Sequence, residues 1–263
     1  FKIIIVDNAN NRKLKEKIQK NFFIFKYILN KKNVGFSAGY NQAIKLSETK
    51  FSLILGPDCI ITENDILKLH SALENNEDCF LTSPIAFNND NILVSAGGLL
   101  PKPNEKETIL QISGDTCVDA TLGACMFLRT KDFLEIGLFD EFFFLYFSDF
   151  DLCRRIRKYK MNIISVYDAK CIHHHGNIKI TNKFIKQFIR DYNYTFDQFY
   201  YFYKSNEISE ILKSFEKKKK SYLFKFIIKI LTFNFIDAIS IFSRLLGFYK
   251  FKSQVKKRRD GRV

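Results

Sequence analysis

The segment from Gly137 to Arg155 carries the side chains best suited to proton transfer. Its sequence, GLFDEFFFLYFSDFDLCRR, places two carboxylates, Asp149 and Asp151, directly after a run of aromatic residues and before a pair of arginines. A carboxylate that takes a proton from a hydroxyl group needs an apolar wall, a fixed position and positive charge nearby. The pattern also suits a helix start, with Ser148 or Asp149 as the N-cap and Asp151 favoured by the helix dipole. The two interpretations are compatible, because a helix terminus is a rigid place to mount a base.

A third carboxylate, Asp58, ends the sequence Gly56-Pro57-Asp58 that follows the apolar segment 51–55. A divalent cation that bridges two phosphates needs few protein ligands, because the phosphates and water supply the others. Asp58 is therefore a candidate metal ligand. An ordinary turn is the alternative, since Pro followed by Asp is common in turns.

Three histidines, His173 to His175, precede Gly176 at the end of a predicted strand. Side chains alternate along a strand, so His173 and His175 are expected to share one face and His174 to lie on the other. One of these imidazoles can ligate a metal or donate a hydrogen bond to a phosphate. The alternative is a solvated polar strand end.

The loop NVGFSAGYN, residues 33–41, contains two glycines and leads into a predicted helix. Exposed N–H groups at a helix start suit a diphosphate or the hydroxyl groups of a sugar. The alternative is a tight turn, with Gly39 at a packing contact.

The elements that must position these residues alternate along the chain. Apolar runs and helical spacing predict strands at 2–6, 24–29, 51–55, 79–84 and 162–167, and helices at 11–21, 36–46, 63–74 and 150–159. This alternation indicates an α/β domain with a mainly parallel central sheet. Ligands of such sheets bind at the carboxyl ends of the strands, where Asp7 and Asp58 fall. The chain opens directly on an apolar strand, so we expect a further strand and helix ahead of it.

Charge is distributed unevenly over the 263 residues. The formal net charge is +14, and residues 217–263 hold fourteen Lys or Arg against Asp237 and Asp260. The other 216 residues are close to neutral. A neutral body argues against nucleic acid as a partner, whereas a basic tail favours an anionic surface. Six dispersed cysteines without a C-x-x-C pair suit a reducing compartment, which predicts a cytoplasmic protein.

The chain beyond residue 181 is predicted to be helical, and residues 221–247 combine apolar and charged positions on opposite faces. Lys225, Lys229, Asp237 and Arg244 would be costly inside a bilayer, so a spanning helix is disfavoured. An in-plane helix at an anionic membrane surface fits better, and would make the protein peripheral at the inner face of the cell membrane. The alternative is a helix packed on the rest of the protein.

Six segments, taken in order, resemble the family 2 glycosyltransferases with a GT-A fold, and particularly bacterial rhamnosyltransferase-like members. The matching segments are IIVDN at 4–8, NVGFSAGYNQAI at 33–44, LGPD at 55–58, GACMFLR at 123–129, GLFDEFFFLYFSDFDLCRR at 137–155 and HHHG at 173–176. The resemblance implies a GT-A domain over residues 1–180, lacking its usual first strand, and a helical basic region over 181–263.

The resemblance also implies a role for each matching residue. Asp149 would be the catalytic base, and Asp58 and His173 would hold Mg²⁺ or Mn²⁺. Asp151 would be either a substrate-binding or a helix-start residue. The other implied contacts to the nucleotide-sugar are Asp7, Asn33, Gly35, Gly39, Asn41 and Gly123.

The activity that the resemblance implies is inverting transfer of a sugar such as rhamnose from a dTDP or UDP donor to a saccharide or lipid-linked acceptor in surface polysaccharide synthesis. Two departures from the family pattern bear on it: Gly56 stands where Asn or Asp is common, and Ser148 replaces an acid. The loss of a neighbouring negative charge favours a lower pKa for Asp149. The departures keep a second interpretation open, a degenerate transferase that binds a nucleotide-sugar or serves as a scaffold. Nucleotidyl transfer is a third, weaker interpretation, since no basic Gly-rich loop follows the first strand.

Overall fold

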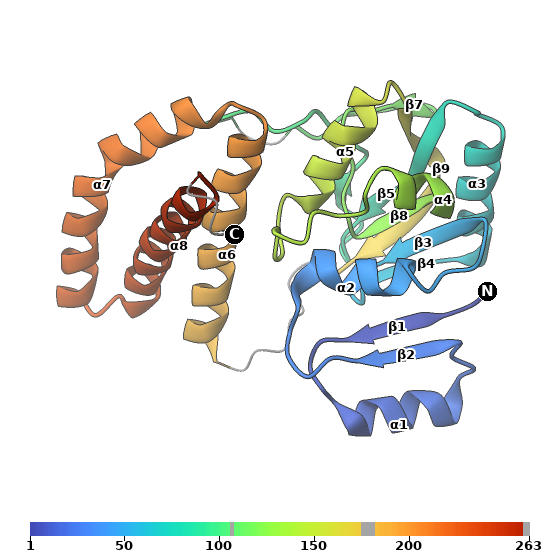
Figure 1. Cartoon of the computed structure of the whole chain (residues 1–263), viewed down its shortest axis with the longest axis horizontal. Helices are drawn as coiled ribbons and strands as arrows, with labels where there is room; N and C mark the ends of the chain where they lie inside the picture. Colours follow the sequence, from blue (N-terminus) through green and yellow to red (C-terminus); the bar gives the residue numbers. More distant parts are fainter. Residues whose placement is uncertain (106–107, 175–181, 260–263) are drawn as a thin grey trace. The chain divides into compact units, whose positions relative to one another are not determined.

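The computed structural model describes residues 1–105, 108–174 and 182–259, and the chain forms two compact units (Figure 1). The first unit consists of residues 1–101, 107–144 and 148–177. The second consists of residues 178–263 together with two short segments, 102–106 and 145–147.

The first unit alternates strands and helices. In chain order it contains β1 (Ile4–Asp7), α1 (Arg12–Asn21), β2 (Lys26–Leu29), α2 (Gly35–Ile44), β3 (Phe51–Leu55), β4 (Cys59–Ile61), α3 (Glu63–Glu74), β5 (Cys79–Phe87), β6 (Leu93–Ser95), β7 (Thr116–Cys117), β8 (Cys125–Arg129), α4 (Thr130–Glu135), α5 (Ser148–Lys158) and β9 (Asn162–His173). The expected strand at 51–55 and helix at 63–74 are confirmed at the same residues.

The strands form two sheets. β1 and β2 pair in parallel, and the seven-stranded sheet has the order β3-β8-β5-β9-β4, with β6 beside β5 and β7 beside β9. The prediction of a mainly parallel sheet needs correction here, because β5–β9 is the one parallel pair described in this larger sheet. The reason is that β8 runs antiparallel to both of its neighbours, β3 and β5, and β4 runs antiparallel to β9.

The core of the first unit lies on both faces of β5, whose residues from Cys79 to Ala86 are all buried. One face packs on a cluster that includes Met126, Leu152 and Ile156, and the other packs on Leu69 and Leu73 of α3. Continuous burial favours a mostly apolar strand, and the buried residues of β5 are apolar except for Thr82, whose hydroxyl donates to the carbonyl of Leu69, and Ser83.

The second unit is an all-helical body made of α6 (Lys183–Lys204), α7 (Ile208–Leu231) and α8 (Phe235–Arg259) (Figure 1). Four rings form its centre: Phe215 and Phe248 stack at 4.2 Å, and Phe199 lies 5.0 Å from Phe248 and 5.5 Å from Phe251. A Cβ at Gly247 would stand 2.5 Å from the carbonyl oxygen of Tyr192, so glycine lets α8 approach α6 closely.

The single amphipathic helix predicted over 221–247 is wrong, because the chain turns at Thr232–Asn234. Phe233 adopts φ +55°, and the N–H groups of Phe233 and Asn234 donate to the carbonyls of Ile230 and Lys229. These contacts close a helix C-terminus in the left-handed manner. Asn234 then caps α8 by accepting from the N–H of Asp237. Of the helices that the structure describes, none has the length and apolar character that crossing a membrane requires.

Candidate active site

Asp58 and His173, the two predicted metal ligands, lie side by side. The short strand β4 pairs with β9 so that Cys59 stands opposite His173, and the N–H of His174 donates to the carbonyl of Asp58 at 2.8 Å. As a result, Oδ2 of Asp58 lies 3.6 Å from Nε2 of His173. The side chain of His173 is 11% exposed and that of Asp58 is 33% exposed, so the pair opens to solvent on the side of the carboxylate. His175 and Gly176 lie outside the described residues.

This pair is suited to a divalent cation that also binds phosphate. Within residues 1–105, 108–174 and 182–259, no three His, Cys, Asp or Glu side chains are grouped as metal ligands. One carboxylate oxygen and one imidazole nitrogen leave most coordination positions to phosphate oxygens and water, as is usual for Mg²⁺ beside a nucleotide diphosphate. Gly56 contributes space here, because a Cβ at this position would stand 2.9 Å from Oδ1 of Asp58.

Asp149 lies in the first turn of α5, where both its oxygens are held. Oδ2 accepts the N–H of Gly123 at 2.9 Å, and Oδ1 accepts the N–H of Phe150 at 2.9 Å. Burial raises the pKa of Asp149 above the ordinary carboxyl value, and these two N–H groups oppose the rise. The expectation of a lowered pKa is therefore corrected: it considered charge alone, whereas desolvation is the larger effect. A fixed carboxylate with a raised pKa is suited to accept a proton.

The dipeptide Gly123–Ala124 links the two acids. Gly123 donates to Asp149, and the carbonyl of Ala124 accepts the N–H of Gly56 at 2.7 Å. A Cβ added to Gly56 would stand 2.9 Å from Oδ1 of Asp58 and 3.5 Å from the carbonyl oxygen of Ala124. Asp58 and Asp149, separated by 91 positions in the sequence, thus flank the same two residues just before β8.

The Gly-containing loop is attached to the aromatic run that precedes Asp149. The N–H of Phe36 donates to the carbonyl of Phe144 at 2.7 Å. Gly35 has φ +88°, and a Cβ on it would stand 2.5 Å from that carbonyl oxygen, so this position requires glycine. Asn33 supports the turn by accepting the N–H of Gly35 at 2.9 Å. The loop at the start of α2 and the segment leading to α5 are therefore held together.

Comparison with known proteins identifies the family. Residues 1–135, just over half of the chain, match the family model described as Glycosyl transferase family 2. The chain belongs to this family. Two curated relatives are similar to it: the Low-salt glycan biosynthesis hexosyltransferase Agl10 of Haloferax volcanii, and the Rhamnosyltransferase WbbL of Escherichia coli K12. The first is 28% identical over 65% of this chain and 58% of its own length, so the chain spans less than two thirds of that relative. The second is 27% identical over 70% of this chain and 77% of its own length.

Solved structures of GT-A glycosyltransferases share the fold of the chain. GalNAc-T7, crystallised with UDP, GalNAc and Mn²⁺, has a TM-score of 0.57 at 14% identity, over 84% of this chain and 51% of its own. The mannosyltransferase PcManGT of Pyrobaculum calidifontis, in complex with GDP-Man and Mn²⁺, has a TM-score of 0.53 at 10% identity, over 95% of this chain and 77% of its own. The predicted GT-A fold of the chain is thus confirmed.

Two residues predicted to contact the substrate form hydrogen bonds inside the protein. Asn41 is buried, and its amide exchanges two hydrogen bonds with the backbone of Phe139, at 2.9 and 3.1 Å. The carboxylate of Asp7 accepts the N–H groups of Ala9 and Asn11 and the hydroxyl of Tyr27, and burial together with Asp7 raises the pKa of Tyr27 to about 12. These contacts give both residues a part in shaping the loops around the site.

Asp151 and Gly39 have packing contacts as well. Asp151 is buried, and its Oδ2 accepts a hydrogen bond from Nε of Arg155. The other two guanidinium nitrogens of Arg155 donate to the carbonyls of Ile136 and Leu138. This arrangement favours the helix-start role for Asp151. Gly39 is buried in α2, and a Cβ on it would stand 3.5 Å from Nδ2 of Asn8.

Sequence reasoning missed several polar residues of the site. The side chain of Asn8 donates to the carbonyl of Gly35 at 3.1 Å and accepts from Asn30 at 2.8 Å, and Asn30 in turn exchanges hydrogen bonds with Gln42. This network joins the ends of β1 and β2 to α2. Tyr40 was also missed: burial and the negative charge of Asp58 raise its pKa. The one available signal was the position of Asn8 directly after Asp7 at a strand end.

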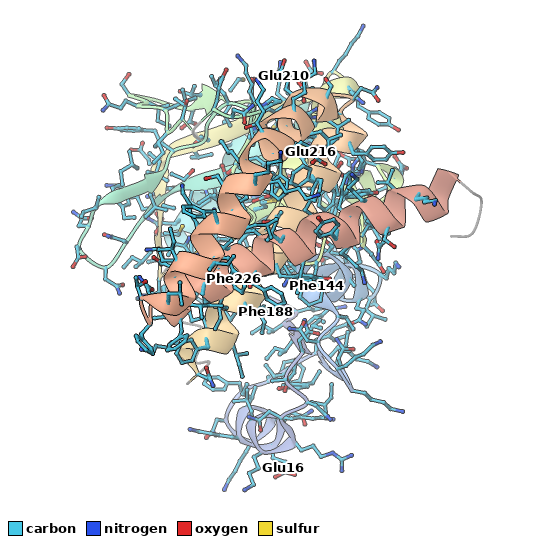
Figure 2. All side chains as sticks on the ribbon, turned by 90° about the vertical axis from the view of Figure 1, so that its left-hand side faces the viewer. Glu16, Phe144, Phe188, Glu210, Glu216 and Phe226 are labelled. Atoms are coloured by element: carbon cyan, nitrogen blue, oxygen red, sulfur yellow. The ribbon has the colours of Figure 1, made fainter. Side chains whose placement is uncertain are left out.

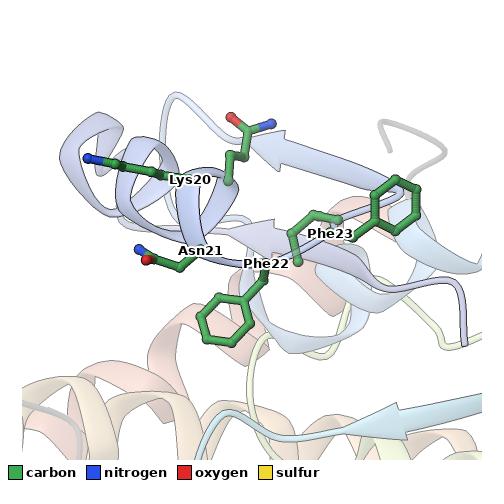
Figure 3. A pocket seen from close by; sticks show the side chains of 6 residues that line it. Lys20, Asn21, Phe22 and Phe23 are labelled. Carbon is green, nitrogen blue, oxygen red and sulfur yellow. The ribbon is translucent and has the colours of Figure 1, made fainter.

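A hollow of about 420 Å³ lies at the end of α1 and is lined by residues 19–24, among them the exposed rings of Phe22 and Phe23 (Figure 3). It includes none of the predicted site residues. We assign it no part in the site.

Proposed function

We propose that this family 2 protein is an inverting glycosyltransferase that moves a sugar from a nucleotide-diphosphate donor to a hydroxyl group of a saccharide or lipid-linked acceptor. The observation that carries the proposal is that both acids are linked to Gly123–Ala124: Asp149 accepts the N–H of Gly123, and Asp58, which lies beside His173, adjoins Gly56, whose N–H donates to Ala124. One side of this arrangement suits a cation with a diphosphate, and the other suits a hydroxyl group that must lose a proton.

In the proposed reaction, the carboxylate of Asp149 takes the proton of the acceptor hydroxyl. The oxygen of that hydroxyl forms a bond to the anomeric carbon of the donor as the bond from this carbon to the diphosphate oxygen breaks on the opposite face. The N–H of Gly123 holds the carboxylate in place. Asp58 and His173 would hold Mg²⁺ or Mn²⁺, which when bound neutralises the charge that develops on the leaving diphosphate.

Relatives support a nucleotide-sugar donor without fixing the sugar. One relative is named a rhamnosyltransferase and another a hexosyltransferase, and the two structural neighbours were solved with UDP and with GDP-Man. We therefore propose dTDP-rhamnose or a UDP-sugar as donor, and surface polysaccharide synthesis as the process.

Hydrolysis of candidate donors tests the function. In the absence of acceptor, we expect slow release of the nucleoside diphosphate from one member of a panel of dTDP-rhamnose, UDP-sugars and GDP-mannose, only with Mn²⁺ or Mg²⁺ present. The competing candidate is a binding protein without turnover, which Gly56 favours by leaving Asp58 as the single acid of its turn. Binding of a donor without its hydrolysis or transfer would select that candidate.

We also propose that α7 and the turn after it bind an anionic membrane surface, which would make the protein peripheral at the cytoplasmic face. The segment from Lys217 to Ile236 contains six lysines and no acidic residue. Lys229 pairs with Asp237 of α8 at 2.7 Å, which neutralises the nearest carboxylate. Lysines near an anionic bilayer contribute about 1 kcal/mol each.

Large apolar side chains are exposed along the same segment. Figure 2 shows α7 running from Glu210 past Glu216 to Phe226, and the exposed residues gather toward its end. They are Leu223, Phe224, Ile227, Ile228, Ile230, Leu231, Phe233 and Phe235, of which Leu231 is 71% and Phe233 79% exposed. Exposed apolar side chains beside lysines are typical of an interfacial segment. By contrast, Leu245, Phe248 and Phe251 of α8 are buried, so the packed-helix alternative describes this part of the tail.

The double variant Leu231→Ser, Phe233→Ser tests the membrane surface. It removes the two most exposed apolar side chains of the segment, each worth about 1.5–3 kcal/mol when buried, so we expect binding to phosphatidylglycerol-containing vesicles to weaken more than tenfold. Sedimentation with vesicles of graded anionic content gives the measurement. Phe22→Ser, Phe23→Ser is the matched control, since these rings are equally exposed on the first unit. Equal vesicle binding by both double variants would contradict the proposal.

A further inference from the structure

The three residues ahead of Ser148 and Asp149 belong to the helical unit. Residues 145–147 cluster with α6, α7 and α8, whereas residues on both sides cluster with the first unit. Asp149 is only two positions beyond Phe147 in the chain. Whatever fixes Leu145–Phe147 therefore limits the conformations open to the start of α5.

A buried carboxylate on α6 holds this segment. Asp197 is 0% exposed, and its Oδ2 accepts the backbone N–H groups of both Leu145, at 3.0 Å, and Tyr146, at 2.8 Å. Hydrogen bonds to an ionised acceptor are stronger than neutral ones, and a buried carboxylate needs such partners. A single oxygen thus fixes two successive peptide groups.

Aromatic packing fixes the next residues of the segment. The ring of Tyr146 lies 5.3 Å from that of Tyr194, and the ring of Phe147 lies 5.4 Å from those of Tyr194 and Tyr201. Phe147 is 4% exposed and has φ +62°, a conformation that is unfavourable for a bulky residue. Such a conformation persists only where the surroundings impose it.

We infer that Asp197 is a positioning residue, which fixes residues 145–147 and through them the catalytic carboxylate of Asp149. This inference rests on the proposed role of Asp149 as base. Within the first unit, the chain on either side of residues 145–147 is also held: the carbonyl of Phe144 accepts the N–H of Phe36, and Asp149 accepts the N–H of Gly123. The helical unit thus has two proposed roles: it positions the segment that precedes the catalytic base, and it binds a membrane surface.

Two buried acids of the same helix allow a matched experiment. Asp191 is 4% exposed, and its carboxylate binds Gln187, Arg190 and Ser240, all on α6 and α8. Asp191→Ala therefore removes a buried carboxylate from the helical unit without removing a hydrogen bond to the backbone of residues 145–147. The full-length chain carrying Asp197→Ala, Asp197→Asn or Asp191→Ala is compared below the unfolding temperature of the least stable variant.

We expect Asp197→Ala to lower kcat about 100-fold relative to Asp191→Ala with the KM for the donor unchanged, because a small misplacement of a reacting group is costly. Amide hydrogen exchange at Leu145 and Tyr146 should accelerate in Asp197→Ala alone. Asp197→Asn should recover part of both losses, since its amide oxygen can still accept the two N–H groups. Equal kcat for Asp197→Ala and Asp191→Ala would overturn the inference. Failure of the proposed function looks different, because then either the wild type shows no turnover or Asp149→Asn keeps the turnover of the wild type.

Discussion

Replacing Asp149 by Asn is expected to reduce sugar transfer about 1,000-fold, because a positioned base contributes roughly 10²–10⁴ to the rate of such a step. The amide keeps an oxygen that can accept the N–H of Gly123 or Phe150, so the loop geometry is largely retained. It cannot take the proton of an acceptor hydroxyl. Donor binding depends on other residues, so the Kd for the nucleoside diphosphate with Mn²⁺ should change less than threefold.

Asp151→Asn is the matched control for this prediction. Asp151 lies one residue beyond Phe150 on the same helix, but its carboxylate binds Arg155 rather than Gly123. Weakening this ion pair should lower the thermal unfolding temperature, while kcat falls much less than in Asp149→Asn. Turnover measured by release of the nucleoside diphosphate distinguishes the two. Near-normal turnover in Asp149→Asn removes the base from the proposed mechanism.

The pH dependence of turnover follows from the same carboxylate. Since burial raises the pKa of Asp149, the base becomes protonated at a higher pH than an ordinary carboxyl group. The kcat should therefore fall tenfold per pH unit below this raised pKa. The stability contribution has the opposite sense: it is fully present below the ordinary carboxyl pKa and is lost as pH rises through the raised one. Acidification thus removes activity without weakening the contribution of Asp149 to folding. Circular dichroism of the wild type should show an intact fold at the pH values where kcat falls.

Local pattern was enough to predict several elements of the fold. The strand at 51–55 and the helix at 63–74 agree with the prediction because each has a clear apolar period, and Thr62 caps the helix by accepting the N–H of Asp65. The identity of Asp58, Asp149 and His173 as site residues rested on motif order, and the structure brings Asp58 and His173 together.

Long-range pairing was beyond the reach of local pattern. The strand β4 is three residues long, and nothing in its sequence indicates that it pairs with β9 and thereby sets Asp58 beside His173. The role of Asn41 depends on Phe139, 98 positions away. The tail illustrates a different limit: its apolar positions fit one long helix, and the left-handed residue that divides it, Phe233, is one that rarely adopts this conformation.

Replacing Asp58 by Asn is expected to weaken donor binding that depends on metal, and to lower kcat/KM about 100-fold. Beside His173, the variant would offer the cation an uncharged amide oxygen in place of a carboxylate oxygen, and a hard divalent cation prefers the charged oxygen. Removing one electrostatic stabiliser of a developing charge costs roughly 10²–10³ in rate. The decisive measurement is a Mn²⁺ titration of nucleoside diphosphate binding by calorimetry. The midpoint in Mn²⁺ should move upward by about tenfold or more in the variant, and excess Mn²⁺ should restore part of the turnover.

The matched control for Asp58→Asn is Asp65→Asn, which removes a carboxylate seven positions further on. Asp65 lies in the first turn of α3, where its carboxylate accepts the hydroxyl of Thr62 and pairs with Lys68 at 3.1 Å, a role in stability rather than in metal binding. Its variant should unfold at a lower temperature with an unchanged Mn²⁺ midpoint. If both variants keep the wild-type midpoint, the cation is held elsewhere or is not needed. Because Asp58→Asn acts on the leaving group and Asp149→Asn on the acceptor, excess Mn²⁺ should restore part of the turnover of the first variant and none of that of the second, a difference that separates their two roles.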